Sequence, residues 1–598
     1  MRPVWKWIIG IVVFLIIVII GVGLYFNSNW KPILETKLKE VVSNSTNGLY
    51  SLKYDDLDLN LTLGNVTLKN AELIPDSVVY QQLVQKKLAP NSRYHIKLDA
   101  LKVRRFNLWD VIMNRKLFIN NIAFDSPSIH LMSERHDFND TLGNKQNKTL
   151  YDNIKEIFSS VNVKDIDIQN VKFKFSKIEQ GKSSALELDS IAIKIHDVLL
   201  DETSVKDTSR LFYTKMVEIN VPGFEYELSN GIYLAKFDHL TINTLEQNVL
   251  MTKVEYKPKM SKADYFKERN QNVTMAVLKF DTLRFEKLDF KRVIDVQQTI
   301  AKLVQIKNGT VSLYNDKRYP KKTSSKIGMS PHQQLMKVKQ LIKIDSILVD
   351  NIDLLYSEHS AKFNQEGTLT FNQAKGVISN VTNDSVTLQN NKFMKAALEA
   401  KIMNAGLLKI QFAFDMLSTT GEHTYKGSLG RMNATAFNKI LRPLLNVELG
   451  SGNIRSVSFN MQGTDRKNWG DFRFDYDHLK LNLLNAPNQD MSKTKKGILS
   501  FVVNNILIND SNPDANEKYH VAKVNYTRVP EHTFFKTLWQ SLLDGIKQCA
   551  GISKEREAKL MGTAESVKDV ASESKKVINK TGNFFKGLFK KKDDQENE

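Results

Sequence analysis

Residues 57–68, LDLNLTLGNVTL, show the pattern from which we predict the fold class. Leucine alternates with polar residues over 57–63, the alternation slips at Gly64-Asn65, and apolar and polar residues alternate again over 66–68. Period-two alternation is typical of a strand with one apolar and one polar face, and a glycine-containing pair between two such runs indicates a hairpin turn. The stretch therefore predicts two antiparallel strands that share one apolar face.

Similar runs recur from about residue 49 to about residue 508, so we expect a mainly β protein. A twisted antiparallel sheet that curls without closing would form an elongated, curved groove with an apolar concave face, over residues 30–530. A few short helices are predicted at 30–42, 80–88, 151–158, 293–304 and 332–342. The candidates for the apolar lining are Leu57, Leu59, Leu61, Val171, Phe173, Phe175, Ile352, Leu354, Tyr356, Phe472 and Phe474.

An uncharged segment near the N-terminus predicts a membrane anchor at 1–29. Residues 8–26 are rich in Ile, Val and Leu and would form about 28 Å of helix, enough to cross a hydrocarbon core. The segment is flanked by residues that favour the headgroup zone, namely Trp5, Trp7 and Trp30. A signal peptide is the alternative, but residues 27–30 lack its small-residue cleavage site. We expect a single-pass anchor with a cytoplasmic N-terminus and the bulk of the chain exported.

Two parts of the chain, 98–200 and 280–385, show the same order of features. Leu98–Val103 corresponds to Phe280–Phe285, and the alternation around 166–175 corresponds to that around 347–356. Each of these later runs contains a pair with asparagine, Gln169-Asn170 or Asp350-Asn351, which we interpret as a turn. The correspondence predicts an internal duplication, as in repetitive elongated sheets.

The C-terminal part differs from the sheet region. Residues 531–552 place apolar side chains at three- to four-residue spacing and predict an amphipathic helix. This helix could pack on the last strands or act as a lid or membrane-docking element. The charged tail at 553–598 ends with a lysine cluster beside Phe584, Phe585 and Phe589, a pattern that suits insertion at an anionic bilayer.

Composition narrows the classes of partner and chemistry. The net charge of +19 favours an anionic partner, but no nucleic-acid reader module occurs, so we expect a membrane surface and no nucleic acid. The single cysteine excludes an intramolecular disulfide framework. No common metalloprotease, Ca²⁺-loop, phosphate-loop or nucleophile-elbow motif occurs. We therefore expect no enzyme, no catalytic residues, no metal and no cofactor.

Several segments together resemble the AsmA-like proteins of the bacterial envelope. These segments are the anchor, the hairpin at 63–68, the segment from Lys116 to Ile129 and a C-terminal block at about 421–530, most distinctly 451–484. The resemblance implies a β-groove that is similar to bridge-type lipid transfer proteins. It also implies location in the bacterial inner membrane with most of the chain periplasmic, and the outer membrane or an envelope protein as a further partner.

Two functions follow as expectations. In the first, the groove binds phospholipid acyl chains and serves lipid transport or homeostasis between inner and outer membranes; burial of each CH₂ group gains about 0.8 kcal/mol. In the second, the sheet is a structural scaffold that assists outer-membrane assembly by binding a partner protein.

Overall fold

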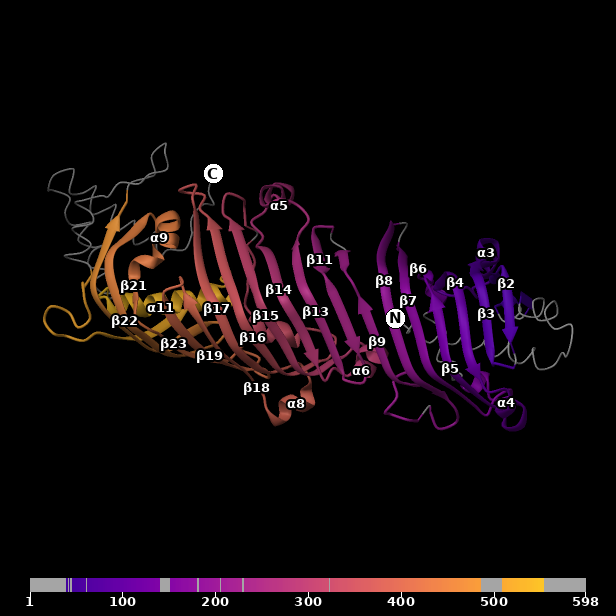
Figure 1. The fold of residues 1–598 in the computed structure, drawn as a ribbon. Coiled ribbons are helices and arrows are strands. Elements are labelled where there is room, and N and C mark those ends of the chain that lie inside the picture. The colour runs from indigo at the N-terminus through magenta and orange to yellow at the C-terminus, as the bar shows by residue number, and fades with distance from the viewer. Residues whose placement is uncertain are drawn as a thin grey trace. The chain divides into compact units, whose positions relative to one another are not determined.

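The computed structural model describes residues 39–552 except 41, 44–45, 61, 140–150, 180–181, 205, 229–230, 322 and 485–507. Within these residues the chain is mainly β, as predicted, and its strands belong to a 24-stranded, mostly antiparallel sheet (Figure 1). No helix in the described ranges combines the length and hydropathy that a bilayer span needs. The predicted anchor, the tail, Trp5, Trp7, Trp30, Leu61, Phe584, Phe585 and Phe589 lie outside the described residues.

The chain divides into two compact units. Unit 1 comprises Met1–Glu227, Ala235–Val254 and Arg284–Ile300, and unit 2 comprises Leu228–Leu234, Glu255–Leu283 and Ala301–Glu598. The elements with residues in both are β11 (Tyr233–Phe237), β13 (Asn248–Pro258), β14 (Met275–Glu286) and β15 (Thr299–Asp316).

The other elements of unit 1 follow the chain closely. They are β1 (Tyr50–Lys53), β2 (Asp56–Asn60), β3 (Asn65–Pro75), α3 (Ser77–Gln85), β4 (Ser92–Phe106), α4 (Leu108–Asn114), β5 (Lys116–Asp125), β6 (Ser128–Glu134), η1 (Asp137–Asn139), η2 (Tyr151–Asn153), β7 (Ser160–Glu179), β8 (Lys182–Leu200), β9 (Thr214–Val221), β10 (Phe224–Glu227), β12 (His239–Asn243) and α6 (Phe290–Val296). Those of unit 2 are α5 (Lys262–Arg269), α7 (Pro331–Met336), β16 (Ile342–His359), β17 (Glu366–Thr382), α8 (Ser385–Asn390), β18 (Phe393–Ile402), β19 (Gly406–Asp415), β20 (His423–Leu429), β21 (Met432–Asn433), η3 (Ala434–Phe437), α9 (Asn438–Leu445), β22 (Val447–Gly463), β23 (Lys467–Leu483), β24 (Val521–Thr527) and α11 (Phe534–Cys549).

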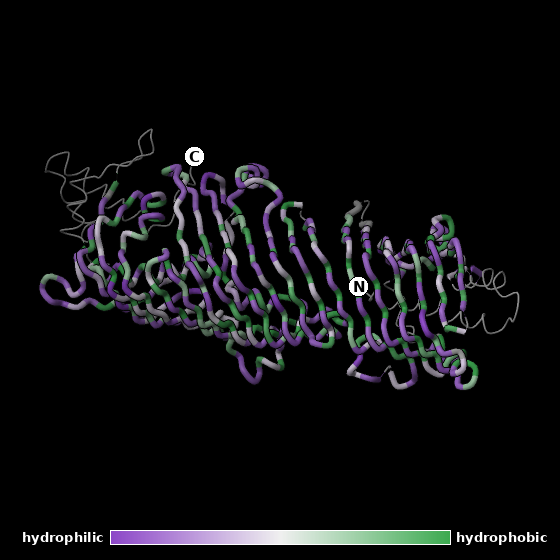
Figure 2. Tube along the Cα trace, in the orientation of Figure 1, coloured by the Kyte–Doolittle hydropathy of each residue, from purple (hydrophilic) through white to green (hydrophobic). Residues whose placement is uncertain are grey.

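The predicted hairpin at 57–68 is present in unit 1. Strand β2 pairs antiparallel with β3, with Leu57 opposite Leu68 and Leu59 opposite Val66. The apolar row that starts there crosses the strands of unit 1 through Leu57, Leu68, Leu101, Phe124, Ile168, Ile193, Ile219, Ile242 and Val249. Figure 2 shows the alternation of hydrophobic and hydrophilic positions along the strands. Most of this row is buried in or packed against one hydrophobic core.

The expectation of a wholly antiparallel sheet is wrong around β7. Strands β5 and β6 both pair with β7 in parallel, with Lys116 opposite Ser160 and Ser128 opposite Lys172. The connection over 135–159 makes this possible, because parallel neighbours need a long crossover. Alternation on one face did not reveal it, since both orientations can place apolar residues on the same side.

The predicted turns at Gln169-Asn170 and Asp350-Asn351 are also wrong. Both pairs lie inside long strands, β7 and β16, at shifts in register typical of β-bulges. Asn170 and Asn351 both have φ of 55°, and Asn351 donates a hydrogen bond to Asn308 at 2.9 Å. A bulge bends its strand and increases its twist, so the polar pair marks a bend in the sheet and not a reversal of the chain.

The duplicated segments have matching elements at a spacing of about 182 or 183 residues. Strands β2 and β12 end at Asn60 and Asn243, and β3 and β13 end at Pro75 and Pro258. Helices α4 and α6 are each preceded by a capping side chain and followed by a left-handed residue, Arg115 or Gln297. These elements share one spacing along the chain, and the internal duplication stays a prediction.

The structure agrees with some of the predicted short helices and differs from others. Helix α3 matches the prediction at 80–88 to within a few residues, and α7 covers the first half of 332–342. The prediction at 293–304 is wrong beyond α6, because β15 begins at Thr299, and 151–158 begins with only the short 3₁₀ turn η2. Strand pairing overrides the weak helical pattern there. The amphipathic helix at 531–552 is confirmed as α11.

Candidate functional site: the apolar inner face of unit 2

An apolar face extends across eight strands of unit 2, from β16 to β24. One row of opposed residues comprises Ile347, Ile378, Ala396, Phe412, Tyr425, Met461, Gly470 and Val524. The neighbouring row on the same face comprises Val349, Gly376, Leu398, Ile410, Gly427, Phe459, Phe472 and Ala522. We call these two rows the inner face. They follow from period-two alternation, which puts every second residue of a strand on one side.

Helix α11 packs on the part of the inner face that the last strands, β20 and β22–β24, form. Its apolar side chains belong to the same hydrophobic core as β20 and β22–β24. A side chain at Gly545 would lie 2.5 Å from a ring carbon of Phe472, so the helix backbone touches the sheet closely. The buried hydroxyl groups of Ser541 and Tyr425 lie 2.9 Å apart and form a hydrogen bond between helix and sheet. Burial raises the pKa of Tyr425 to about 12.

The coverage of the inner face changes along the sheet. Under α11, Tyr425 and Met461 are 0% exposed and Phe472 is 1% exposed. On the strands before β20, the larger side chains are only partly buried, and they are Ile347, Val349, Ile378, Leu398, Ile410 and Phe412. The described part of unit 2 therefore covers its apolar inner face incompletely between β16 and β19. We call this part the open face.

The predicted groove residues fall into two groups. Those that are buried are Leu57, Leu59, Val171, Ile352, Phe472 and Phe474, and those that are partly buried are Phe173, Phe175, Leu354 and Tyr356. Leu354 and Tyr356 lie opposite Phe371 and Leu369, which pack against the core of unit 2. The sequence interpretation missed Ile347, Ile378 and Phe412. The alternation that identified Leu354 was also present around them, but it did not show which strands a helix would cover.

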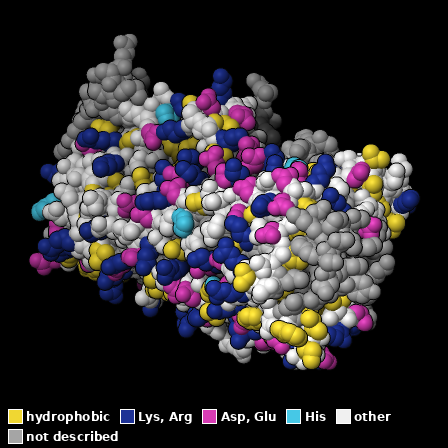
Figure 3. All heavy atoms as spheres, turned by 45° about the vertical axis from the view of Figure 1, so that its right-hand side comes forward, with side chains coloured by type: hydrophobic (Ala, Val, Ile, Leu, Met, Phe, Trp, Pro, Cys, Tyr) yellow, Lys and Arg dark blue, Asp and Glu magenta, His cyan; other side chains and the backbone are white. Residues whose placement is uncertain are grey.

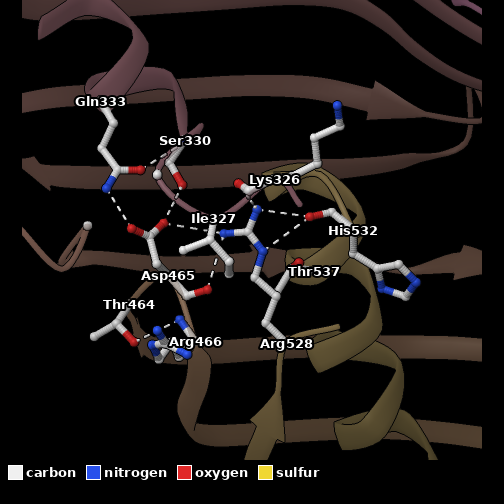
Figure 4. Close-up of polar contacts among 12 residues, drawn as sticks. Lys326, Ile327, Ser330, Gln333, Thr464, Asp465, Arg466, Arg528, His532 and Thr537 are labelled. Carbon is white, nitrogen blue, oxygen red and sulfur yellow. Dashed lines mark hydrogen bonds and ion pairs between the residues drawn. The ribbon is translucent and has the colours of Figure 1, made fainter. Parts of the chain in front are cut away.

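A polar cluster fixes the start of α11 to the rest of unit 2 (Figure 4). Arg528 and Asp465 form a buried ion pair, with a nitrogen–oxygen distance of 3.4 Å and side-chain exposures of 1% and 7%. Asp465 also accepts hydrogen bonds from Gln333 Nε2 at 2.6 Å and Ser330 Oγ at 3.4 Å. Arg528 Nη2 donates to the carbonyl oxygens of Lys326 and His532, both at 2.8 Å. We call this cluster the clasp; it joins the loop before α7, the β22–β23 turn and the segment before α11.

Two buried histidines lie near the clasp. His332 is 0% exposed and stacks on Phe414 with 5.1 Å between ring centroids, and neither ring nitrogen has a hydrogen-bond partner among the described residues. Burial, with a smaller contribution from His423, lowers the pKa of His332 to about 4. Burial also lowers the pKa of His423, whose Nδ1 lies 2.8 Å from the Gly421 carbonyl oxygen. Both rings are therefore neutral at pH 7 and act as packing residues.

The fold defines a mainly β protein with a partly covered apolar sheet face. In the described ranges, no group of three His, Cys, Asp or Glu side chains is arranged to hold a metal ion. No protein-family model matches the chain, and no curated protein sequence matches it significantly.

Proposed function

We propose that the protein binds lipid acyl chains on the open face and takes part in phospholipid transport or homeostasis at the membrane. The observation that carries this proposal is the change in burial along the inner face, from covered under α11 to partly exposed on β16–β19. Acyl chains placed there would leave water, which gains about 0.8 kcal/mol per buried CH₂ group. No catalytic residue is required.

The resemblance to AsmA-like proteins supports the cellular setting of this proposal. In that setting the segment 8–26 anchors the chain in a bacterial inner membrane, the rest is periplasmic, and the open face of unit 2 takes part in carrying lipid between inner and outer membranes. The alternation of the sequence, the predicted anchor and the open face are consistent with one another in this arrangement.

The test is a comparison of two adjacent residues on β19. Phe412 lies at the border of the open face, where its ring centroid is 6.4 Å from that of Phe534 of α11, whereas Gln411 lies on the opposite side of the strand and is exposed. We expect Phe412→Asp to reduce co-purified lipid, measured by mass spectrometry, and transfer between vesicles by more than tenfold. Gln411→Asp should change neither, and circular dichroism should show that both variants are folded. Undiminished lipid and transfer in folded Phe412→Asp would contradict the proposal.

A second candidate function is a structural scaffold that binds an envelope partner. The observation that favours it is the packed core of unit 1, in which Leu57 and Ile122 are 0% exposed. A purified chain that carries no lipid but captures a defined outer-membrane assembly protein would support this second function.

A further inference from the structure

Helix α4 of unit 1 presents large apolar side chains to solvent. Trp109 is 74% exposed, Met113 is 73% exposed and Ile112 is 55% exposed, whereas Val111 is buried and holds the helix to the sheet. Single exposed apolar residues are ordinary, but neighbouring ones on one helix indicate an interaction surface.

Local contacts bring further apolar residues to the same edge of unit 1. The Arg115 guanidinium donates hydrogen bonds to the carbonyl oxygens of Lys155, Glu156 and Ile157, which fixes the 49% exposed Ile157 side chain near the end of α4. At the start of α4, Phe106 N donates to Gly64 O at 2.9 Å, beside the 62% exposed Leu63. We define the α4 patch as Leu63, Trp109, Ile112, Met113 and Ile157. Figure 3 shows hydrophobic side chains gathered at the lower edge of the view, on the side where Figure 1 places α4.

Helix α6, which lies 182 residues later in the chain, keeps an isoleucine, Ile294, at the position of Ile112 but has polar residues at the positions of Trp109 and Met113. Helix α6 occupies the equivalent position, with Asp289 as its cap where α4 has Asn107. At the positions of Trp109 and Met113, α6 has Lys291 and Asp295, which form an ion pair at 3.5 Å. A helix with equivalent caps therefore tolerates an exposed polar pair at the positions where α4 has Trp109 and Met113.

The sequence around α4 is also more basic than the sequence around α6. Residues 104–116 contain four basic side chains and one acidic side chain, whereas residues 286–298 contain three of each. Arg104 and Arg105 precede α4, and Arg115 and Lys116 follow it. Each basic residue near an anionic bilayer contributes about 1 kcal/mol of attraction, and tryptophan favours the headgroup zone.

The position of the patch in the chain agrees with a bilayer as its partner. The uncharged segment ends at residue 26, and β1 begins at Tyr50, so the intervening chain can span no more than about 80 Å. We propose that the α4 patch docks on the anionic surface of the bilayer in which residues 8–26 are anchored. This inference does not depend on lipid binding at the open face, because all residues of the patch belong to unit 1.

The test uses the full chain reconstituted in vesicles of equal parts phosphatidylglycerol and phosphatidylcholine. Met113→Cys and, as the matched control, Asp295→Cys are each labelled with an environment-sensitive fluorophore. The native Cys549 is 0% exposed, and burial raises its pKa to about 11, so the introduced thiol reacts selectively. We expect brominated lipid to quench the label at residue 113 at least threefold more than the label at 295, and this difference to shrink in phosphatidylcholine alone.

A second variant separates docking from folding. Trp109→Lys in the Met113→Cys background places the α6 residue on α4, where the equivalent backbone already carries it, and should reduce the lipid quenching to the level at residue 295. Equal quenching at both positions, or full access of iodide to the label at 113, would overturn the proposal. Protection from iodide without quenching by brominated lipid would also overturn it, because the patch would then be covered by protein.

Discussion

At the residue scale, the buried groups near α11 make stability depend on pH. The pKa of His332 is lowered from 6.5 to about 4 by burial, so the unfolded chain binds a proton more readily than the folded chain between these values. The groups that face the ring include His423, Asp465 and Asp415, and the two aspartates oppose the shift only partly. Above about pH 6.5, His332 therefore does not lower the unfolding free energy, and the unfolding free energy declines as the pH falls from 6.5 toward 4.

We expect His332→Phe to remove part of this acid sensitivity. The wild-type chain should lose about 3 kcal/mol of unfolding free energy through His332 between neutral pH and pH 4, and the variant should lose correspondingly less. Chemical denaturation at several pH values measures the difference. As a control, Leu388→Ala destabilises the same hydrophobic core without removing a titratable group, so its loss between neutral pH and pH 4 should equal that of the wild type. Parallel profiles for wild type and His332→Phe would contradict the expectation.

The clasp leads to a second prediction at this scale. Arg528→Met leaves the Asp465 carboxylate buried without its ionic partner, and such a change costs about 3–5 kcal/mol. The control is Arg466→Met, which changes an exposed residue in the β22–β23 turn next to Asp465. It should change the unfolding free energy by no more than about 0.5 kcal/mol. Combining Arg528→Met with Asp465→Leu should restore much of the loss, because no buried charge remains. A loss for the double variant as large as that for Arg528→Met would argue against this account.

At the element scale, α11 determines how much of the inner face is covered. The sequence predicted the helix, because its apolar residues recur at helical spacing, and it left open whether the helix packs on the last strands. The packing is shown by Gly545, where the helix backbone meets Phe472, and by the Ser541–Tyr425 hydrogen bond. Neither contact has a local sequence signal, since both join residues far apart in the chain.

Gly545→Ala should therefore displace α11 from the sheet. The added methyl group would lie 2.5 Å from the Phe472 ring, and overpacking of this kind costs about 1–3 kcal/mol. Alanine by itself favours a helix by up to about 1 kcal/mol over glycine. A decrease in the unfolding free energy of Gly545→Ala would therefore show that the clash with Phe472 outweighs this gain. The unfolding free energy and the reactivity of Cys549, which is buried at the end of α11, measure the displacement, and Gln540→Ala is the control on the same helix. A more stable Gly545→Ala variant with unreactive Cys549 would show that the helix yields without cost.

The bulges show where sequence interpretation reached its limit at the element scale. Alternation and the antiparallel hairpin could be predicted, because they depend on neighbours in the sequence, but the register could not: a turn at Gly64-Asn65 would set Leu61 opposite Leu68, where the structure has Leu57. The pairs that contain Asn170 and Asn351 are predicted as turns, and the structure has bulges there, because a turn and a bulge leave the same local signal. The partner strand distinguishes them, and strand partners are set by contacts distant in the chain.

At the scale of the whole molecule, lipid binding should change stability by mass action. A ligand at one hundred times its dissociation constant stabilises the folded chain by about 2.7 kcal/mol if the unfolded chain does not bind it. We expect the delipidated full chain to melt at a higher temperature when monodisperse short-chain phosphatidylglycerol is added, and folded Phe412→Asp to show a much smaller shift. The sequence predicted an apolar sheet face, but it did not show which strands form the open face, because burial depends on which strands α11 covers. An equal shift for wild type and Phe412→Asp would place the lipid elsewhere on the molecule.

The parallel pairing around β7 has a consequence for how the chain acquires its structure during synthesis. Lys116 of β5 leaves the ribosome 44 residues before its partner Ser160, an interval of several seconds at roughly 5–20 residues per second. Each antiparallel hairpin, by contrast, can close as soon as its second strand emerges. The edge of β5 therefore stays unpaired while these 44 residues are translated, and an unpaired strand edge is a place where a holding chaperone can act on the nascent polypeptide.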